Sequence, residues 1–155
     1  MHDDAAAHQP HAARRRWMAV LARASATELA EMLDRHADVP RYTMLRGPEA
    51  GLVMVRGRTG GGGAPFNMGE MTVTRCTVRT ESGQVGHAYV AGRDARQAEL
   101  AAVLDAMLQD PDQTFALQAA VISPLAEAQQ TRRAAIAAKA AATKVQFFAM
   151  RNMRS

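Results

Sequence analysis

Residues 71–108 read MTVTRCTVRTESGQVGHAYVAGRDARQAELAAVLDAML, and the spacing of apolar residues changes inside this stretch. Residues 71–79 and 85–91 alternate in polarity as β-strands do, and a Ser-Gly turn signal lies between them. Asp94 then occupies an N-cap position, Gln97 the capping-box position, and apolar residues follow at helical spacing. The stretch therefore predicts two antiparallel strands followed by a helix.

Two helices are predicted ahead of these strands. Residues 14–24 place apolar side chains on one helical face, and residues 1–12 before them are predicted to be a mobile tail. Ser25 and Glu28 form a capping box at the start of the second helix. This helix should end before Pro40, because the residue preceding a proline avoids helical geometry.

Two more strands are predicted between the helices and the stretch quoted above. Residues 42–45 and 52–56 have strand composition, and the Gly- and Pro-containing residues 47–51 are predicted to join them as a hairpin turn. The glycine-rich residues 57–65 then form a loop. Four strands with short connections predict an antiparallel meander.

Helices are predicted again after the meander. The Asp-Pro-Asp sequence at 110–112 ends one helix, and residues 115–122 fit either a helix or a strand. Ser123-Pro124 opens an Ala-rich helix that runs to about residue 143, and the bulky residues 145–150 suit a last strand. The prediction is a single α+β domain over residues 13–155, with two N-terminal helices, a four-stranded meander, C-terminal helices and a last strand.

Composition narrows the class of protein. The 155 residues carry a net charge of +4, and a single cysteine excludes an internal disulfide framework and multi-cysteine metal sites. No apolar run reaches the roughly 18 residues of a membrane span. The arginines at 14–16 precede an apolar run of six residues, which is too short for an export signal, so a cytoplasmic protein is expected.

The candidate contacts to phosphate or to a partner are Arg56, Arg58, Arg75, Arg79 and His87. Arg56 and Arg58 flank the glycine run, which lacks the Gly-Lys-Ser/Thr of a Walker-type loop and is either a flexible connection or a contacting loop. Arg75 and Arg79 share one strand face. His87 either fills a core or interface position or acts as a general base, and the sequence assigns it no carboxylate partner. No catalytic, cofactor or metal site is predicted.

The candidate subunit interface comprises Ile136, Phe147 and Phe148. The Ala-rich helix has few large side chains, so it is either solvated or open to close approach by another backbone. Phe147 and Phe148 would point to opposite faces of the predicted last strand, which leaves one for a partner. Cys76 is predicted to be a buried structural thiol.

Five segments occur in a fixed order along the chain: residues 17–22, 51–58 with 66–70, 72–79, 86–94 with 98–100, and 145–150. Together they resemble the PhnG family, the G subunits of bacterial carbon–phosphorus lyase, over about residues 14–152. The resemblance implies a cytoplasmic core complex with H, I and J subunits, each in two copies. In such a complex a phosphonate displaces adenine from MgATP and gives ribose 1-phosphonate 5-triphosphate.

The resemblance also implies how the chemistry is divided. MgATP is the substrate of the complex, and an iron–sulfur cluster and S-adenosylmethionine belong to a partner subunit. No catalytic residue of the family can be carried over to this chain, so a non-catalytic or accessory subunit without a cofactor of its own is expected.

Two other functions remain open from the residues alone. A stand-alone enzyme acting on phosphate substrates would use the arginine-lined strand face, because arginine suits bidentate phosphate contacts. Nucleic-acid binding through residues 14–16 would weaken steeply with salt, but the charge of +4 is spread along the chain rather than concentrated.

Overall fold

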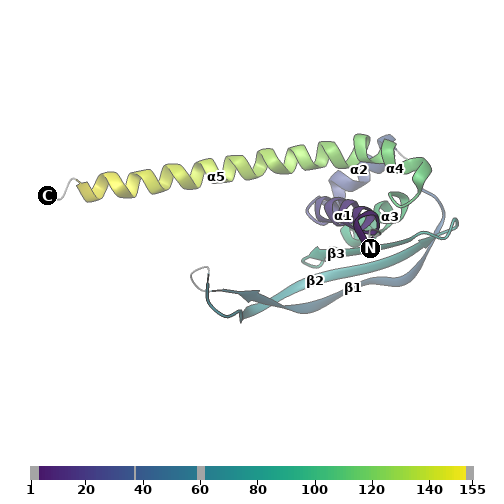
Figure 1. Cartoon of the computed structure of the whole chain (residues 1–155), viewed down its shortest axis with the longest axis horizontal. Coiled ribbons are helices and arrows are strands. Elements are labelled where there is room, and N and C mark those ends of the chain that lie inside the picture. The colour runs from purple at the N-terminus through teal and green to yellow at the C-terminus, as the bar shows by residue number, and fades with distance from the viewer. Residues whose placement is uncertain (1–3, 37, 59–61, 153–155) are drawn as a thin grey trace.

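The computed structural model describes residues 4–36, 38–58 and 62–152, and the side chains of residues 11–36, 38–58 and 62–142. Its elements, in chain order, are α1 (Asp4–Leu21), α2 (Ala26–His36), β1 (Tyr42–Gly57), β2 (Phe66–Thr80), β3 (Val85–Ala91), α3 (Ala95–Met107), α4 (Pro111–Leu117), the π-helical turn η1 (Gln118–Ile122) and α5 (Ser123–Asn152). The α+β class predicted from the sequence is confirmed (Figure 1).

The sheet has three antiparallel strands in the order β1-β2-β3, so the prediction of four strands was wrong. β1 runs without a turn through residues 47–51, and its pairing with β2 shifts between Met44 and Arg46 and again between Arg46 and Glu49. These shifts absorb Gly47 and Pro48 in the strand, and a proline is tolerated there because β1 lies at the edge of the sheet. The hairpin therefore closes between β1 and β2, around the glycine-rich loop.

The helices cover one face of the sheet, and the core lies between the two layers (Figure 1). Fully buried side chains from both layers meet there, among them Leu21, Leu29, Val78, Val90 and Leu104. α3 packs so closely on β3 that a Cβ atom on Gly86 would lie 1.9 Å from the carbonyl oxygen of Ala102. Glycine at 86 is therefore a packing requirement rather than a turn signal.

The predicted capping interactions are present in full at the start of α2 and in part at the start of α3, and α1 begins earlier than predicted. At α2 the Ser25 N–H donates to Glu28 Oε2 at 2.8 Å, and the Glu28 N–H donates to Ser25 Oγ at 3.2 Å, which confirms the capping box. At α3 the Asp94 side chain accepts from the Gln97 N–H at 2.9 Å, but the Gln97 side chain donates to the carbonyl of Ala24 at 2.7 Å instead of closing the box. α1 begins at Asp4, about ten residues before the predicted start, so part of the predicted tail is helical.

The C-terminal half differs most from the prediction. α4, η1 and α5 follow one another without a loop, and the Ser123 N–H bonds to the Gln118 carbonyl, five residues back. This wider turn adapts the hydrogen-bond ladder just before Pro124, which has no N–H to donate. α5 then continues to Asn152, so the predicted strand at 145–150 was wrong, because the Ala-rich segment favours a helix and no strand of the described residues pairs with it.

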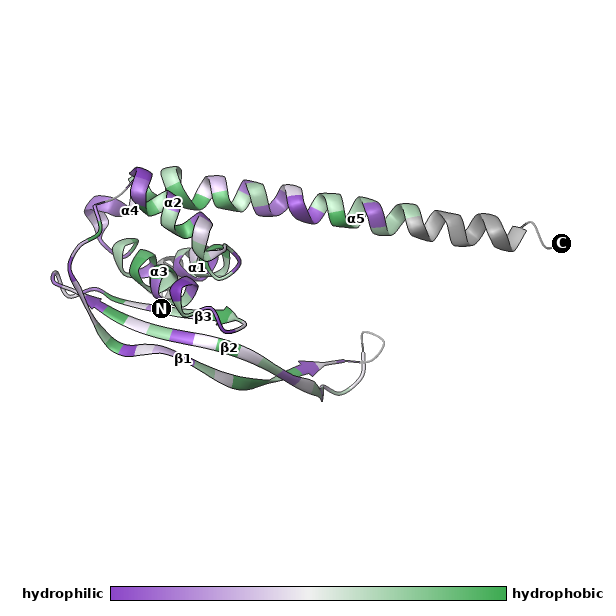
Figure 2. Cartoon of the chain, turned by 180° about the vertical axis from the view of Figure 1, so that it is seen from behind, coloured by the Kyte–Doolittle hydropathy of each residue, from purple (hydrophilic) through white to green (hydrophobic). Residues whose placement is uncertain are grey.

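Two long elements extend beyond the body of the molecule, on the same side in both ribbon views (Figures 1 and 2). One is the distal part of the β1–β2 hairpin, called here the hairpin arm, which comprises the described residues of 50–58 and 66–71. The other is α5 beyond Arg132, which is itself ion-paired with Glu28 of α2; the described side chains at 133–142 are all exposed. Green and purple segments alternate along the hairpin in Figure 2, so apolar side chains are present on it although the helices do not cover it.

Candidate functional site

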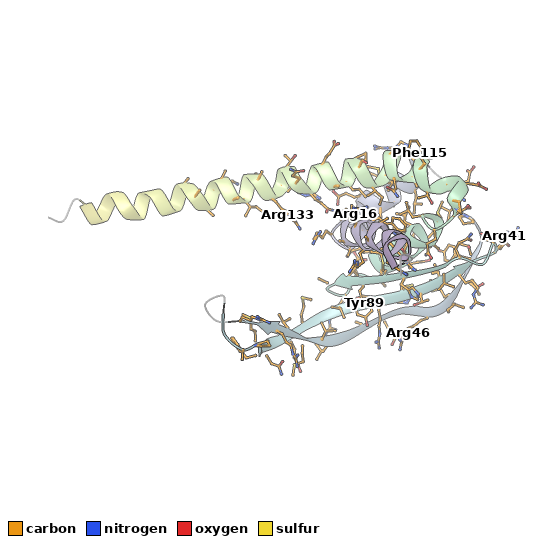
Figure 3. All side chains as sticks on the ribbon, viewed as in Figure 1. Arg16, Arg41, Arg46, Tyr89, Phe115 and Arg133 are labelled. Atoms are coloured by element: carbon orange, nitrogen blue, oxygen red, sulfur yellow. The ribbon has the colours of Figure 1, made fainter. Side chains whose placement is uncertain are left out.

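The predicted arginine-lined face lies on the side of the sheet away from the helices. Register places Arg75 opposite Tyr89 and Thr77 opposite His87. Arg46 projects from the same side of β1 (Figure 3). This face therefore holds part of the predicted set of candidate contacts, and the charges of Arg46 and Arg75 on it are paired with Glu49 of the same chain.

Glu49 is the acidic group that balances this face. It forms an ion pair with Arg46, and its Oε2 atom lies 3.6 Å from Arg75 Nη2. The hydrogen bond from Arg46 lowers the pKa of Glu49, and the charge of Arg75 acts in the same direction. A hydrogen bond with Tyr89, together with the Glu49 charge, raises the pKa of Arg75, whose Nε atom is buried without a hydrogen-bond partner. Arg75 is therefore engaged by this chain's own groups rather than free for phosphate.

The other predicted arginines lie elsewhere. Arg79 is exposed on the same face as Arg75, whereas Arg56 pairs with Asn67, eight residues along β2 from Arg75. At about 3.3 Å per residue this separation is roughly 26 Å. Arg58 is exposed just beyond the end of β1. Because the arginines are spread along the hairpin, a single phosphate site that uses all of them has no geometric support.

His87 is exposed, which excludes the core alternative of the predicted core or interface position. Its Nδ1 atom lies 3.2 Å from Thr77 Oγ1 across the strand pair, and no carboxylate contacts its ring within the described residues. The general-base alternative therefore lacks the orienting acid that such a residue ordinarily has. The interface alternative is compatible with its exposed position.

The main polar centre of the fold is Asp105, which the sequence analysis did not single out. Its carboxylate is fully buried and accepts from Arg14 Nε at 3.2 Å, Arg14 Nη2 at 2.7 Å and Trp17 Nε1 at 2.8 Å. It also accepts from the backbone N–H of His87 at 2.9 Å. One side chain on α3 thereby ties α1 and β3 together. The sequence does contain a signal for this network, since Asp105 lies within the otherwise apolar stripe of α3. A charged side chain at such a position is buried with that face of the helix and needs buried hydrogen-bond partners.

The hairpin arm carries a cluster of exposed large apolar side chains. They are Leu52 (63% exposed), Met54, Val55, Phe66, Met68 (65% exposed) and Met71. On α5, Ile136 is 68% exposed, as expected for an interface residue without its partner. Phe147 and Phe148 lie in the helical part of the backbone, but their side chains are outside the described residues. Exposed apolar side chains on two projecting elements are suited to contact with another protein.

The remaining chemistry-bearing groups are structural. Cys76 is buried as predicted, and burial raises the pKa of its thiol, which makes it a poor nucleophile. Within the described residues no group of three or more His, Cys, Asp or Glu side chains is placed to hold a metal ion. No helix in this part of the chain is both long and apolar enough to cross a membrane.

These features define a class: a small α+β protein with helices on one face of a three-stranded sheet and with projecting elements that expose apolar side chains. Comparison with known proteins narrows the class to a family. The model of the family described as "Phosphonate metabolism protein PhnG" matches residues 12–152. The chain is also 44% identical over 150 residues to the "Alpha-D-ribose 1-methylphosphonate 5-triphosphate synthase subunit PhnG" of Rhizobium meliloti (strain 1021), covering 96% of this chain and 92% of that protein. The chain therefore belongs to the PhnG family.

Proposed function

We propose that this chain is a non-catalytic, accessory subunit of a cytoplasmic carbon–phosphorus lyase core complex. The complex would form ribose 1-phosphonate 5-triphosphate from MgATP and a phosphonate. The chain would assemble with H, I and J subunits, each in two copies. It would hold no cofactor of its own, whereas MgATP is the substrate of the complex and the iron–sulfur cluster and S-adenosylmethionine belong to a partner subunit.

The uncovered apolar surface of the hairpin arm is the observation that carries this proposal. Leu52, Met54 and Met68 are long apolar side chains on a two-stranded ribbon that no helix of the body covers. A large exposed apolar patch is unfavourable in water unless another surface covers it. A permanent partner subunit would remove this surface from water and would also fix the ribbon.

The projecting part of α5 supplies a second contact surface in this proposal. Ile136 is a large apolar side chain within an otherwise Ala-rich helix, and small side chains let another backbone approach closely. Phe147 and Phe148 extend the proposed interface toward the end of the helix. Interfaces of permanent complexes are more apolar than the rest of the protein surface, which agrees with these residue types.

Co-expression of the tagged full chain with the H, I and J subunits of the same organism tests the proposal. We expect one stable assembly with equal copies of the four subunits, measured by size-exclusion chromatography and native mass spectrometry. Elution of the chain alone, folded and monomeric, in the presence of all three partners would contradict the proposal.

A matched pair of variants localises the contact. Met54→Glu places a charge on the hairpin arm, whereas Thr43→Glu places the same charge on an exposed position of the same strand over the body. Both positions are exposed, so both variants should fold, which circular dichroism checks. We expect Met54→Glu to weaken assembly by about tenfold or more, because the charge must be desolvated at an apolar contact, and Thr43→Glu to assemble as the wild type does.

A further inference from the structure

The free edge of β3 divides into two parts with different backbone pairing. Thr72 and Gly92 form a hydrogen-bonded pair across β2 and β3, with the Gly92 N–H 2.9 Å from the Thr72 carbonyl. Because pairs alternate along an antiparallel ladder, the backbone groups of residues 85, 87, 89 and 91 point away from β2. These outward groups form the edge of the sheet.

Side chains of the same molecule occupy the first part of this edge. The outward N–H of His87 donates to Asp105 Oδ2 at 2.9 Å. The outward carbonyl of Val85 accepts from Gln109 Nε2 at 2.8 Å and from Arg14 Nη2 at 3.2 Å. In contrast, the outward N–H groups of Tyr89 and Ala91 make no hydrogen bond within the described residues. The edge is therefore closed at its start and open over residues 89–91.

A groove runs beside this edge, between β3 and α1. One section has a volume of about 700 Å³ and is lined by His11, Arg14, Arg15, Met18, His87 and Tyr89. A second section of about 210 Å³ shares Met18, His87 and Tyr89 with the first and is otherwise apolar, with small side chains such as Ala19 and Ala22. The shared lining residues place the two sections next to each other.

The two ends of the groove differ in charge and in apolar character. No carboxylate lines either section among the described residues, although Asp105 behind the first section is paired with Arg14. Arg15 is exposed at the rim and forms no ion pair in the described part of the chain. One end of the groove therefore favours negative charge, and the other end favours small apolar side chains.

We propose that this groove binds an extended acidic segment of a partner subunit, which adds to β3 as a fourth strand. The segment's main chain pairs with the open edge at Tyr89 and Ala91. Its acidic side chains lie toward Arg15, and a small apolar side chain enters the inner section. This mode derives affinity from main-chain hydrogen bonds and specificity from alternate side chains. The inference rests on the proposed function, because it requires that the chain be a subunit of a complex.

Charge alone would equally suit a free phosphate group, but two features favour a protein segment. Unpaired backbone N–H groups on a sheet edge are a template for another strand. The apolar inner section would also be left uncovered by inorganic phosphate. An extended segment with acidic and apolar side chains would contact the charge of Arg15, the unpaired N–H groups of the edge and the apolar inner section.

Amide hydrogen exchange on the full complex tests the proposal directly. The partner is the assembly of H, I and J subunits, co-expressed with this chain. We expect the amides of Tyr89 and Ala91 to exchange at least about tenfold more slowly in the complex than in the free chain. The amide of His87 is the internal reference, because Asp105 already accepts its hydrogen bond in the free chain.

Two variants with matched controls separate main-chain from charge recognition. Tyr89→Pro removes the outward N–H without removing a bond of the chain's own ladder, and Tyr89→Ala removes the same side chain but keeps the N–H. Arg15→Glu reverses the charge at the groove, and Arg16→Glu makes the same change at the neighbouring position of α1, which does not line it (Figure 3). We expect Tyr89→Pro to weaken assembly about tenfold or more relative to Tyr89→Ala. Arg15→Glu should weaken assembly about tenfold or more, whereas Arg16→Glu should stay within about threefold of the wild type.

The outcomes separate this proposal from the proposed function. If the wild-type chain assembles but the amides of residues 89–91 exchange at the free rate, the groove is not an interface and the strand-addition proposal is wrong. Equal assembly by Arg15→Glu and Arg16→Glu would also overturn it, as would phosphate binding at Arg15 without any effect on assembly. Failure of the wild-type chain to join H, I and J would overturn the proposed function and this inference with it.

Discussion

Replacing Asp105 with asparagine should destabilise the fold severely while changing almost no volume. The two oxygens of the carboxylate receive four hydrogen bonds, and each donor comes from a group that is itself wholly or partly buried. Oδ1 accepts from Arg14 Nε and Trp17 Nε1, and Oδ2 accepts from Arg14 Nη2 and the His87 N–H. The substitution therefore tests the network without creating a cavity.

The size of the effect follows from this geometry. An asparagine amide has one acceptor oxygen and one NH2 group, so in either orientation two donors face a donor. A hydrogen bond to a charged group contributes about 1.5–3 kcal/mol, and Arg14 also loses its buried counter-charge. We expect Asp105→Asn to lower the free energy of unfolding by about 3–5 kcal/mol, a large part of the roughly 5–15 kcal/mol typical of a domain.

Urea denaturation followed by tryptophan fluorescence measures this loss. Trp17 is the only tryptophan in the chain and belongs to the network, so its emission reports on the perturbed site. Asp34→Asn is the matched control, because Asp34 is exposed on α2 and should change stability by no more than about 0.5 kcal/mol. An Asp105→Asn variant whose free energy of unfolding stays within about 0.5 kcal/mol of the wild type would refute the reasoning.

Three further predictions follow from individual contacts. Gly86→Ala should lower the denaturation midpoint strongly, because its Cβ would overlap the α3 backbone, whereas Gly69→Ala, with nothing within 4 Å, should not. Tyr42 should ionise with a pKa of about 12, because of burial and its hydrogen bond to a glutamate; absorbance at 295 nm of Tyr89→Phe, which leaves it as the only tyrosine, measures this. Since that pKa exceeds the value of about 10 in an unfolded chain, this stabilisation is complete below pH 10 and is lost as the pH rises toward 12. Ser25→Ala should cost about 1 kcal/mol in thermal or urea unfolding through loss of the α2 cap.

Local chemistry was readable from the sequence wherever a few adjacent residues decide the structure. The Ser25 and Glu28 capping box, the alternation in residues 71–79 and the apolar stripe of α3 each depend on short-range spacing. These patterns placed α2, β3 and α3 correctly and β2 from Met71 onward, although β2 begins at Phe66. They also placed Cys76 in the core, because its neighbours in the strand alternate in polarity.

The features that the sequence did not predict depend on contacts between residues that lie far apart in the chain. Gly47 and Pro48 have the composition of a turn, but pairing with β2 continues past them and carries them as irregularities in an edge strand. Residues 145–150 have strand composition, yet they continue α5. Asp105 acquires its role from Arg14, Trp17 and the backbone of His87, which lie 91, 88 and 18 residues away in the sequence.

The hairpin arm and the projecting part of α5 differ in how much their stability depends on a partner. Residues 66–71 of β2 are exposed, whereas burial alternates or is complete from Val73 onward, where α3 packs on the sheet. α5 is anchored by Gln129 Nε2, which donates to the Val20 carbonyl at 2.9 Å, and by Arg132 Nη1, which donates to Glu28 Oε1 at 2.8 Å. Its described side chains beyond Gln129 are exposed. An Ala-rich helix holds its own backbone hydrogen bonds by propensity, whereas an isolated two-stranded ribbon is marginal in water. The hairpin arm is therefore the element whose stability depends most on a covering surface, and α5 the one that can remain folded before a partner arrives.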